Sequence, residues 1–160
     1  MKKYLLYLFI ISFLYADQKR DMMLPDMLIK LIDGEQTRLS SLLEDGAILV
    51  EFWATWCAPC KEEMPSLNRL QSNKSFYNLK IFPINVGQES ILRSQEFFDQ
   101  LSIDNLEVYI DDTVKTANQF SLRGLPTTIL INKKGEEFAR ILGAIDFDNE
   151  KFIEWLKNYD

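Results

Sequence analysis

The chain has no histidine and only two cysteines among its 160 residues. Because a tetrahedral metal site needs four ligands, the usual nitrogen and sulfur donors for such a site are missing. We therefore expect no metal and no cofactor beyond the cysteines themselves. No internal repeat, low-complexity tract or linker rich in proline, glycine and serine divides the sequence. Its length and apolar content suit one domain whose core does not depend on a disulfide.

Basic residues are in the minority, with 18 lysines and arginines against 24 aspartates and glutamates and a formal net charge of -6. Removal of residues 1–16 would take away two lysines and no acid, leaving 16 basic and 24 acidic residues and a net charge of -8. Proteins that bind nucleic acids or anionic membranes need a basic patch. The charge balance therefore argues against a nucleic-acid partner.

The N-terminus carries an apolar run at residues 4–15, which follows Lys2 and Lys3 and precedes Ala16. This order is typical of a secretory signal. With about twelve apolar residues, the run is shorter than the ~20 residues that a membrane-spanning helix needs. We therefore expect an exported chain in which residues 1–16 are a signal peptide or an N-terminal membrane anchor.

Cleavage after Ala16 would place Leu14 at the third position before the cut, where a smaller residue is preferred. Retention of the segment as an anchor therefore stays open. A buried core helix is a third interpretation, which the lack of an amphipathic stripe disfavours. With cleavage or anchoring, residues 17–160 form the exported domain.

The two cysteines, Cys57 and Cys60, lie three positions apart at a predicted junction between a strand and a helix. They can close a small disulfide ring, and a helix N-terminus beside Cys57 would stabilise its thiolate, the species that attacks disulfides. As a permanent staple the ring would be weak, because so short a loop removes little entropy from the unfolded chain. The spacing therefore predicts thiol-disulfide exchange.

Hydrophobic patterning and turn signals predict alternating strands and helices. Residues 28–32 and 36–39 flank Asp33 and Gly34 as the strands of a hairpin would, and the apolar run at 47–53 is typical of a central strand. Further strands are expected at 80–86, 106–110, 127–132 and 137–142, and helices at 42–45, 62–72 (kinked at Pro65), 90–101, 113–120 and 149–159. This order predicts an α/β fold with a mixed central sheet flanked by helices.

Three motifs resemble those of the TlpA/ResA-type thioredoxins: FWATWCAPCKEEMP at 52–65, NVG at 85–87 and GLPTTILIN at 124–132. The similarity covers essentially the whole chain from Leu24 onward. It implies a thioredoxin fold with an N-terminal β-hairpin and an inserted strand–helix unit, which we place near residues 80–101.

The resemblance also implies an exported bacterial reductant, often membrane-tethered, that serves apocytochrome c or other exported proteins with cysteines. Such a protein works in the periplasm or at the outer face of the inner membrane. Because a reductant in an oxidising compartment needs electrons from inside, the resemblance implies a membrane electron donor of the CcdA or DsbD type. We expect a monomer.

Within this scheme the two sulfurs have different roles. Cys57, exposed at the first turn of the helix, is the expected nucleophile, and the deeper Cys60 resolves the mixed disulfide. Resolution requires an acceptor for the Cys60 proton, and Glu51 and Glu63 are the candidates.

Glu51 occupies the strand position where thioredoxins usually carry a buried aspartate and many TlpA/ResA relatives an asparagine. Glu63 matches the acid that ResA-like proteins place next to the cysteine pair. Which of the two accepts the proton is open. A solvent-facing position is the alternative for each.

Four further residues are expected at the substrate side of the site. By resemblance, Pro126 is a cis proline packed against the disulfide, which would present the backbone of Leu125 to an extended substrate. Trp56 is expected to be a partly exposed apolar platform beside Cys57, whereas Trp53 is structural. Pro59 shapes the helix start and limits which backbone donors reach Cys57.

The direction of electron flow follows from thiolate stability. Strong oxidants of the DsbA type have a very stable thiolate and usually a histidine inside the motif, whereas this motif holds Ala58 and Pro59. Nearby acids also raise a thiol pKa. We therefore expect a reductant. A general disulfide reductase, isomerase or oxidase without a cytochrome role, a thiol peroxidase, and a non-catalytic binding module or chaperone are the alternatives.

Overall fold

An apolar strand with its side chains buried on both faces forms the centre of the fold. In this computed structural model, which describes residues 28–31, 33–38, 41, 47–111, 113 and 115–159, β3 (Ile48–Trp53) is buried along its whole length. It pairs in parallel with β4 (Lys80–Asn85) and antiparallel with β6 (Thr127–Ile131). The prediction of a central strand at 47–53 is confirmed.

The described strands form one mixed sheet in the order β2-β1-β5-β4-β3-β6-β7. The remaining strands are β1 (Leu28–Lys30), β2 (Gln36–Arg38), β5 (Tyr109–Ile110) and β7 (Glu137–Leu142). The predicted hairpin is present as β1 and β2, whose turn uses the positive φ of Gly34, +86°. β6 and β7 form a second antiparallel hairpin at the other edge.

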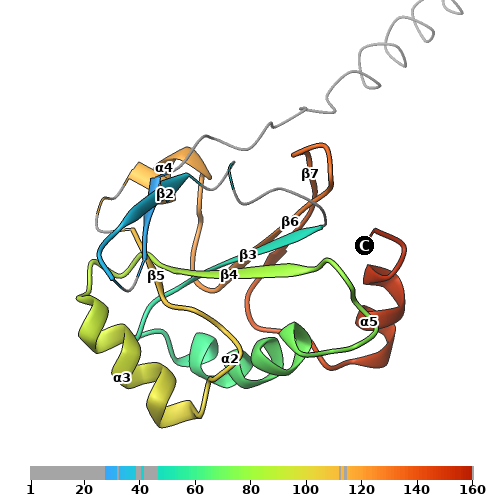
Figure 1. Ribbon diagram of the computed structural model, residues 1–160, viewed down its shortest axis with the longest axis horizontal. Helices are drawn as coiled ribbons and strands as arrows, with labels where there is room; N and C mark the ends of the chain where they lie inside the picture. The colour runs from blue at the N-terminus through green and yellow to red at the C-terminus, as the bar shows by residue number, and fades with distance from the viewer. Residues whose placement is uncertain are drawn as a thin grey trace, which may run out of the picture.

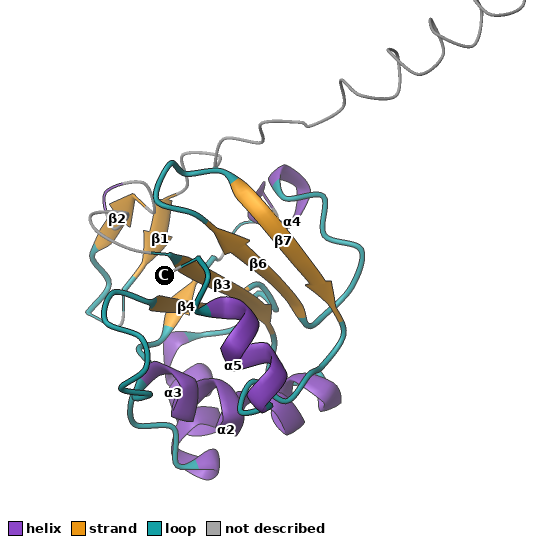
Figure 2. Ribbon diagram, turned by 90° about the vertical axis from the view of Figure 1, so that its right-hand side faces the viewer, coloured by secondary structure: helices purple, strands orange, loops and turns teal. Residues whose placement is uncertain are grey.

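Helices cover both faces of the sheet, as Figures 1 and 2 show. α2 (Ala58–Gln71), α3 (Ile91–Leu101) and α5 (Glu150–Leu156) lie on one face, and α4 (Lys115–Gln119) lies on the other. Because strand side chains alternate, Leu49 and Trp53 belong to the core beneath α2, whereas Val50 and Phe52 belong to the opposite core. The predicted α/β architecture is confirmed.

Several predicted element boundaries were wrong, and the start of α2 and the extent of β5 differ most; the helix predicted at 149–159 also ends at Leu156. The helix predicted at 62–72 begins four residues earlier, because Cys57 is its N-cap and its sulfur accepts a hydrogen bond from the Cys60 N–H. β5 is much shorter than the strand predicted at 106–110. The predicted unit at 80–101 corresponds to β4 and α3.

The predicted leader at 1–16 and the predicted helix at 42–45 lie outside the described residues. Within the described part of the chain, no helix has the length and apolar character needed to cross a membrane.

Candidate functional site

Cys57 and Cys60 form a disulfide at the start of α2, with an S–S distance of 2.02 Å. The backbone N–H of Cys57 donates to the carbonyl of Ala54 (3.1 Å), and the Cys60 N–H lies 3.3 Å from the Cys57 sulfur. Cys60 is fully buried and Cys57 is 5% exposed. The prediction of an exposed Cys57 is wrong for this disulfide form, since its sulfur is bonded to Cys60 beneath it, but Cys57 remains the outer of the two.

Glu51 lies fully buried on the α2 side of β3, the side shared by Leu49 and Trp53. Its position in the middle of the sheet makes the solvent-facing alternative wrong. Its Oε2 accepts a hydrogen bond from the hydroxyl of Thr128, the residue opposite it on β6. Its Oε1 is buried and has no donor among the described residues.

Glu63 lies on α2 one helical turn after Cys60, on the same side of the helix, and is 2% exposed. Its Oε2 accepts from the backbone N–H of Ile145 at 3.2 Å, and its Oε1 is a second buried carboxyl oxygen with no donor in the described structure other than the Glu51 carboxyl group in its protonated form. The alternative of a solvated helix face therefore applies to its exposed neighbour Glu62 and not to Glu63. A groove of about 370 Å³, which Ser66 and Ile145 also line, reaches Glu63 from outside.

The Glu51 and Glu63 carboxyl groups interact with each other inside the protein. Burial and the negative charge of Glu63 raise the pKa of Glu51 well above its ordinary value. Burial also raises the pKa of Glu63 to about 7, against the lowering effect of hydrogen bonds from Glu51 and from the Ile145 N–H. A proton on Glu51 supplies a donor to Glu63, so one shared proton satisfies two buried groups that would otherwise repel.

The substrate-side residues lie around the same end of the sheet. Trp56 is 68% exposed, and Trp53 is fully buried. The Leu125–Pro126 peptide bond is cis. Pro126 immediately precedes β6, whose first residue Thr127 pairs with Phe52 near the end of β3, so topology brings this loop to the edge from which the cysteine motif emerges.

Pro59 is the second residue of α2, a position at which its missing N–H costs no helical hydrogen bond. Leu125 packs against the cores on both faces of the sheet.

Comparisons with known proteins agree with this geometry. The AhpC/TSA family profile matches residues 21–136. The chain belongs to the AhpC/TSA family. It is 32% identical over 134 residues to the thiol-disulfide oxidoreductase ResA of Geobacillus kaustophilus, covering 83% of this chain and 75% of the relative. It is 30% identical over 121 residues to ResA of Bacillus subtilis, covering 76% and 66%. The chain is therefore a thiol-disulfide oxidoreductase related to ResA.

Solved structures place this oxidoreductase in the thioredoxin-like fold. A putative thiol:disulfide interchange protein DsbE from Chlorobium tepidum superposes with a TM-score of 0.73 at 22% identity, covering 84% of this chain and 93% of the other. StoA from Bacillus subtilis superposes with a TM-score of 0.65 at 23% identity, covering 83% and 94%. At these identities the likeness shows the fold alone.

Several residues that contact the site were missed from the sequence. Thr128 and the Ile145 N–H hold the two carboxyl groups, but they lie 77 and 82 positions away along the chain from the acids that they contact. Glu89, which contacts Thr55 of the cysteine motif, was also missed. It directly precedes the N-cap Ser90, where an acid is expected at any helix start, so its position alone carried no signal of a role at the cysteines. Among the described residues, no cluster of three or more metal-ligating side chains was found.

Proposed function

We propose that this oxidoreductase is an exported reductase of protein disulfides that works through a Cys57–Cys60 dithiol. The Cys57 thiolate attacks a substrate disulfide, forms a mixed disulfide and releases one substrate thiol. Cys60 then attacks the Cys57 sulfur, closes the ring and releases the second thiol, so that two electrons pass to the substrate. The disulfide at the start of α2 beside a buried carboxyl pair is the observation that supports this proposal most strongly.

The start of α2 favours the Cys57 thiolate. Cys57 is the N-cap, so the unpaired N–H groups and the positive end of the helix dipole lie at its sulfur. The Cys60 N–H is directed to that sulfur. Because Pro59 has no N–H, it offers no donor to the thiolate. This environment supports Cys57 as the nucleophile.

The carboxyl pair is the proposed acceptor of the Cys60 proton. Glu63 lies one turn from Cys60 and has a pKa of about 7, so it is partly deprotonated near neutral pH and can take up a proton there. Glu51, with its higher pKa, remains protonated and holds the shared proton. The groove beside Glu63 gives a route by which the accepted proton leaves to solvent.

The substrate is proposed to bind as an extended segment along Leu125 and Pro126, with the exposed Trp56 as an apolar contact. Strand addition gives affinity through backbone hydrogen bonds and needs little side-chain complementarity. This mode suits an enzyme whose substrates share a disulfide and not a sequence.

Direction is tested by the reduction potential of the Cys57–Cys60 couple. The motif lacks histidine, and the buried acids Glu51 and Glu63 flank it in the chain, so we expect a value nearer the ~-270 mV of thioredoxin than the ~-120 mV of DsbA. Equilibration with glutathione or with dithiothreitol buffers measures it. A value above about -150 mV would reverse the proposed direction.

The finer proposal is that substrates include apocytochrome c and that a CcdA- or DsbD-type membrane protein re-reduces the disulfide. The location would be the periplasm or the outer face of the inner membrane, with residues 1–16 as signal or anchor. Similarity to ResA supports this proposal.

Trapping tests the substrates directly. Expressed in cells, Cys60→Ser should hold substrates on Cys57 as mixed disulfides, which mass spectrometry identifies, and the double variant with Cys57→Ser is the control. Recovery of apocytochrome c would support the specific role, and a broad set of exported proteins would favour a general reductase. If cellular activity were unchanged in Cys57→Ser, a non-redox binding module would replace the proposal.

A further inference from the structure

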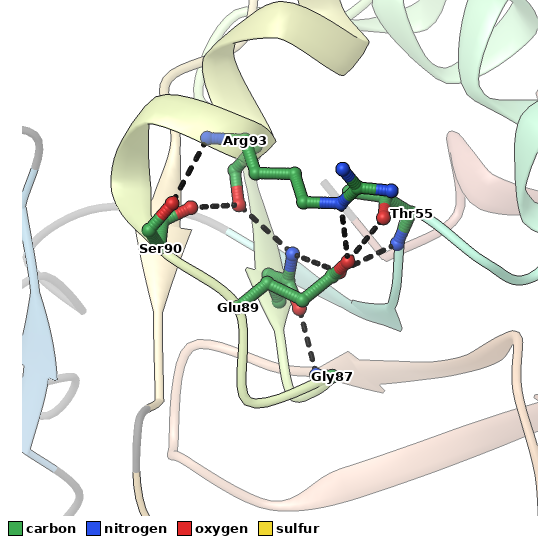
Figure 3. Close-up of polar contacts among 7 residues, drawn as sticks. Thr55, Gly87, Glu89, Ser90 and Arg93 are labelled. Atoms are coloured by element: carbon green, nitrogen blue, oxygen red, sulfur yellow. Dashed lines mark hydrogen bonds and ion pairs between the residues drawn. The ribbon is translucent and has the colours of Figure 1, made fainter.

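A third acidic side chain, Glu89, reaches the loop before Cys57 from the start of α3, as Figure 3 shows. Its carboxylate is surrounded by four donors. One oxygen accepts from the Thr55 N–H (2.8 Å) and the Asn85 amide (3.1 Å). The other accepts from the Thr55 hydroxyl and from Arg93 Nε (3.3 Å). The Glu89 carboxylate therefore binds both the backbone N–H and the side-chain hydroxyl of Thr55, which lies two residues before the nucleophile Cys57.

One peptide unit, between Ala54 and Thr55, hydrogen-bonds to both Glu89 and Cys57. The N–H of the Ala54–Thr55 peptide donates to Glu89, and its carbonyl accepts from the Cys57 N–H at 3.1 Å. Residues 54–57 thus form a turn whose first peptide is held at both ends. Trp56, the exposed aromatic, lies inside that turn. Any rotation of the held peptide would move Cys57 and Trp56 together.

The loop that carries Glu89 is shaped for close approach to this turn. A Cβ on Gly87 would lie 2.8 Å from the Ala54 Cβ and 2.8 Å from the Glu89 carboxylate. The Gly87 N–H is tied to the Asn85 side chain at 2.7 Å, and Gln88 has a positive φ of 59°. A non-glycine residue in that region is costly and is often kept for function.

The carboxylate stays ionised in this setting. Burial alone would raise the pKa of Glu89, but the hydrogen bonds from Thr55, Asn85 and Arg93 lower it below the ordinary value. Asn85 is in turn held by Ser94 of α3 at 2.9 Å. A charged acceptor with four donors makes stronger and more directional bonds than a neutral one.

We propose that Glu89 is a positioning residue for disulfide exchange, holding the 54–57 turn so that Cys57 sits over Cys60. The inference rests on the proposed function of the cysteine pair. The two sulfurs close a disulfide in proportion to their effective concentration, which falls when one of them is free to move. Loosening the turn should therefore destabilise the disulfide relative to the dithiol.

Two variants test the positioning role. Glu89→Gln keeps the size of the side chain but removes its charge, and Thr55→Val removes the hydroxyl without changing any charge. In each, the equilibrium with glutathione should shift about threefold to tenfold toward the dithiol, where tenfold corresponds to ~30 mV. Thr55→Ser, which retains the hydroxyl, should match the unmodified protein. Asp99→Asn removes an exposed acid of α3 that lies outside the pocket lined by Thr55 and Arg93, and it is the matched control.

The outcomes separate positioning from other roles. A shift in Glu89→Gln with Thr55→Val within twofold of the unmodified protein would mean that charge acts through space, and it would overturn the positioning role. A lower melting temperature without any shift would mean a purely structural role. If Glu89→Gln did not fold, the Thr55→Val and Thr55→Ser pair would decide the question. Failure of the unmodified protein to exchange with glutathione would instead overturn the proposed function itself.

Discussion

Single buried acids are costly, and this protein places two of them, Glu51 and Glu63, against each other in its core. An ionised carboxylate inside an apolar core costs several kcal/mol unless it is paired or neutral. Glu51 avoids this cost because it remains protonated, and the Thr128 hydroxyl donates a hydrogen bond to its Oε2. Glu63 is the member that loses and regains a proton near neutral pH. The pair should therefore be treated as one titrating unit.

Replacing Glu63 and replacing Glu51 should have different effects on the rate of disulfide exchange and on its pH dependence. Glu63→Gln should slow release of substrate from Cys57 about a hundredfold and abolish the inflection near pH 7, because the acceptor is lost. Glu51→Gln replaces a neutral, protonated acid by a neutral amide that can still donate a hydrogen bond to Glu63, so the inflection should stay near pH 7 with a smaller loss of rate. Stopped-flow reduction of a disulfide substrate across pH 5 to 9 measures both. Exposed Glu62→Gln is the control, and a larger loss in Glu51→Gln would reverse the roles of the two acids.

At the scale of elements, local patterns predicted most of the fold, because each strand and helix had its own signal. The burial of β3 followed from its apolar run, and the strands β6 and β7 were expected from their own patterns; the turn that joins them uses the positive φ of Gly135, +79°. The start of α2 was predicted too late because a cysteine is an unusual N-cap. The Glu51–Thr128 contact depends on the register between β3 and β6, and the Glu89–Thr55 hydrogen bonds depend on the conformation of the loop before α3. Neither can be predicted from the local sequence.

The loop between β4 and α3 gives a prediction about elements. Gly87→Ala would force a Cβ to within 2.8 Å of Ala54 and should destabilise the protein by about 1–3 kcal/mol. Gly124→Ala is the matched control, since a Cβ there meets no atom within 4 Å. Urea unfolding of both variants measures the difference. Equal stability of the two would show that the loop relaxes away from β3.

For the whole molecule, the carboxyl pair couples stability to pH. The pKa of Glu63 is about 7 when folded and 4.5 as a free side chain, so between these values the folded state binds more protons than the unfolded state. The stabilising contribution of Glu63 is therefore complete below pH 4.5 and is lost as the pH rises through 7.

Comparison with Glu63→Gln isolates this effect from other titrating groups. Between pH 5 and pH 8, the stability of the unmodified protein should fall relative to the variant by about 2–3 kcal/mol. Urea unfolding of the oxidised proteins at both pH values measures the change. A constant difference between the two proteins would show that Glu63 titrates normally in the folded state.

The protonation of the carboxyl pair can be observed without interference from other side chains that titrate near neutral pH. With no histidine in the sequence and both cysteines in a disulfide, no imidazole or thiol of the oxidised protein can absorb protons in the neutral range. The carbonyl-stretching band of a protonated carboxylic acid, followed by infrared spectroscopy between pH 6 and 8, would therefore report on Glu51 and Glu63 without labelling. Reduction of the disulfide would then show, in the same band, whether electrons and protons enter this site together.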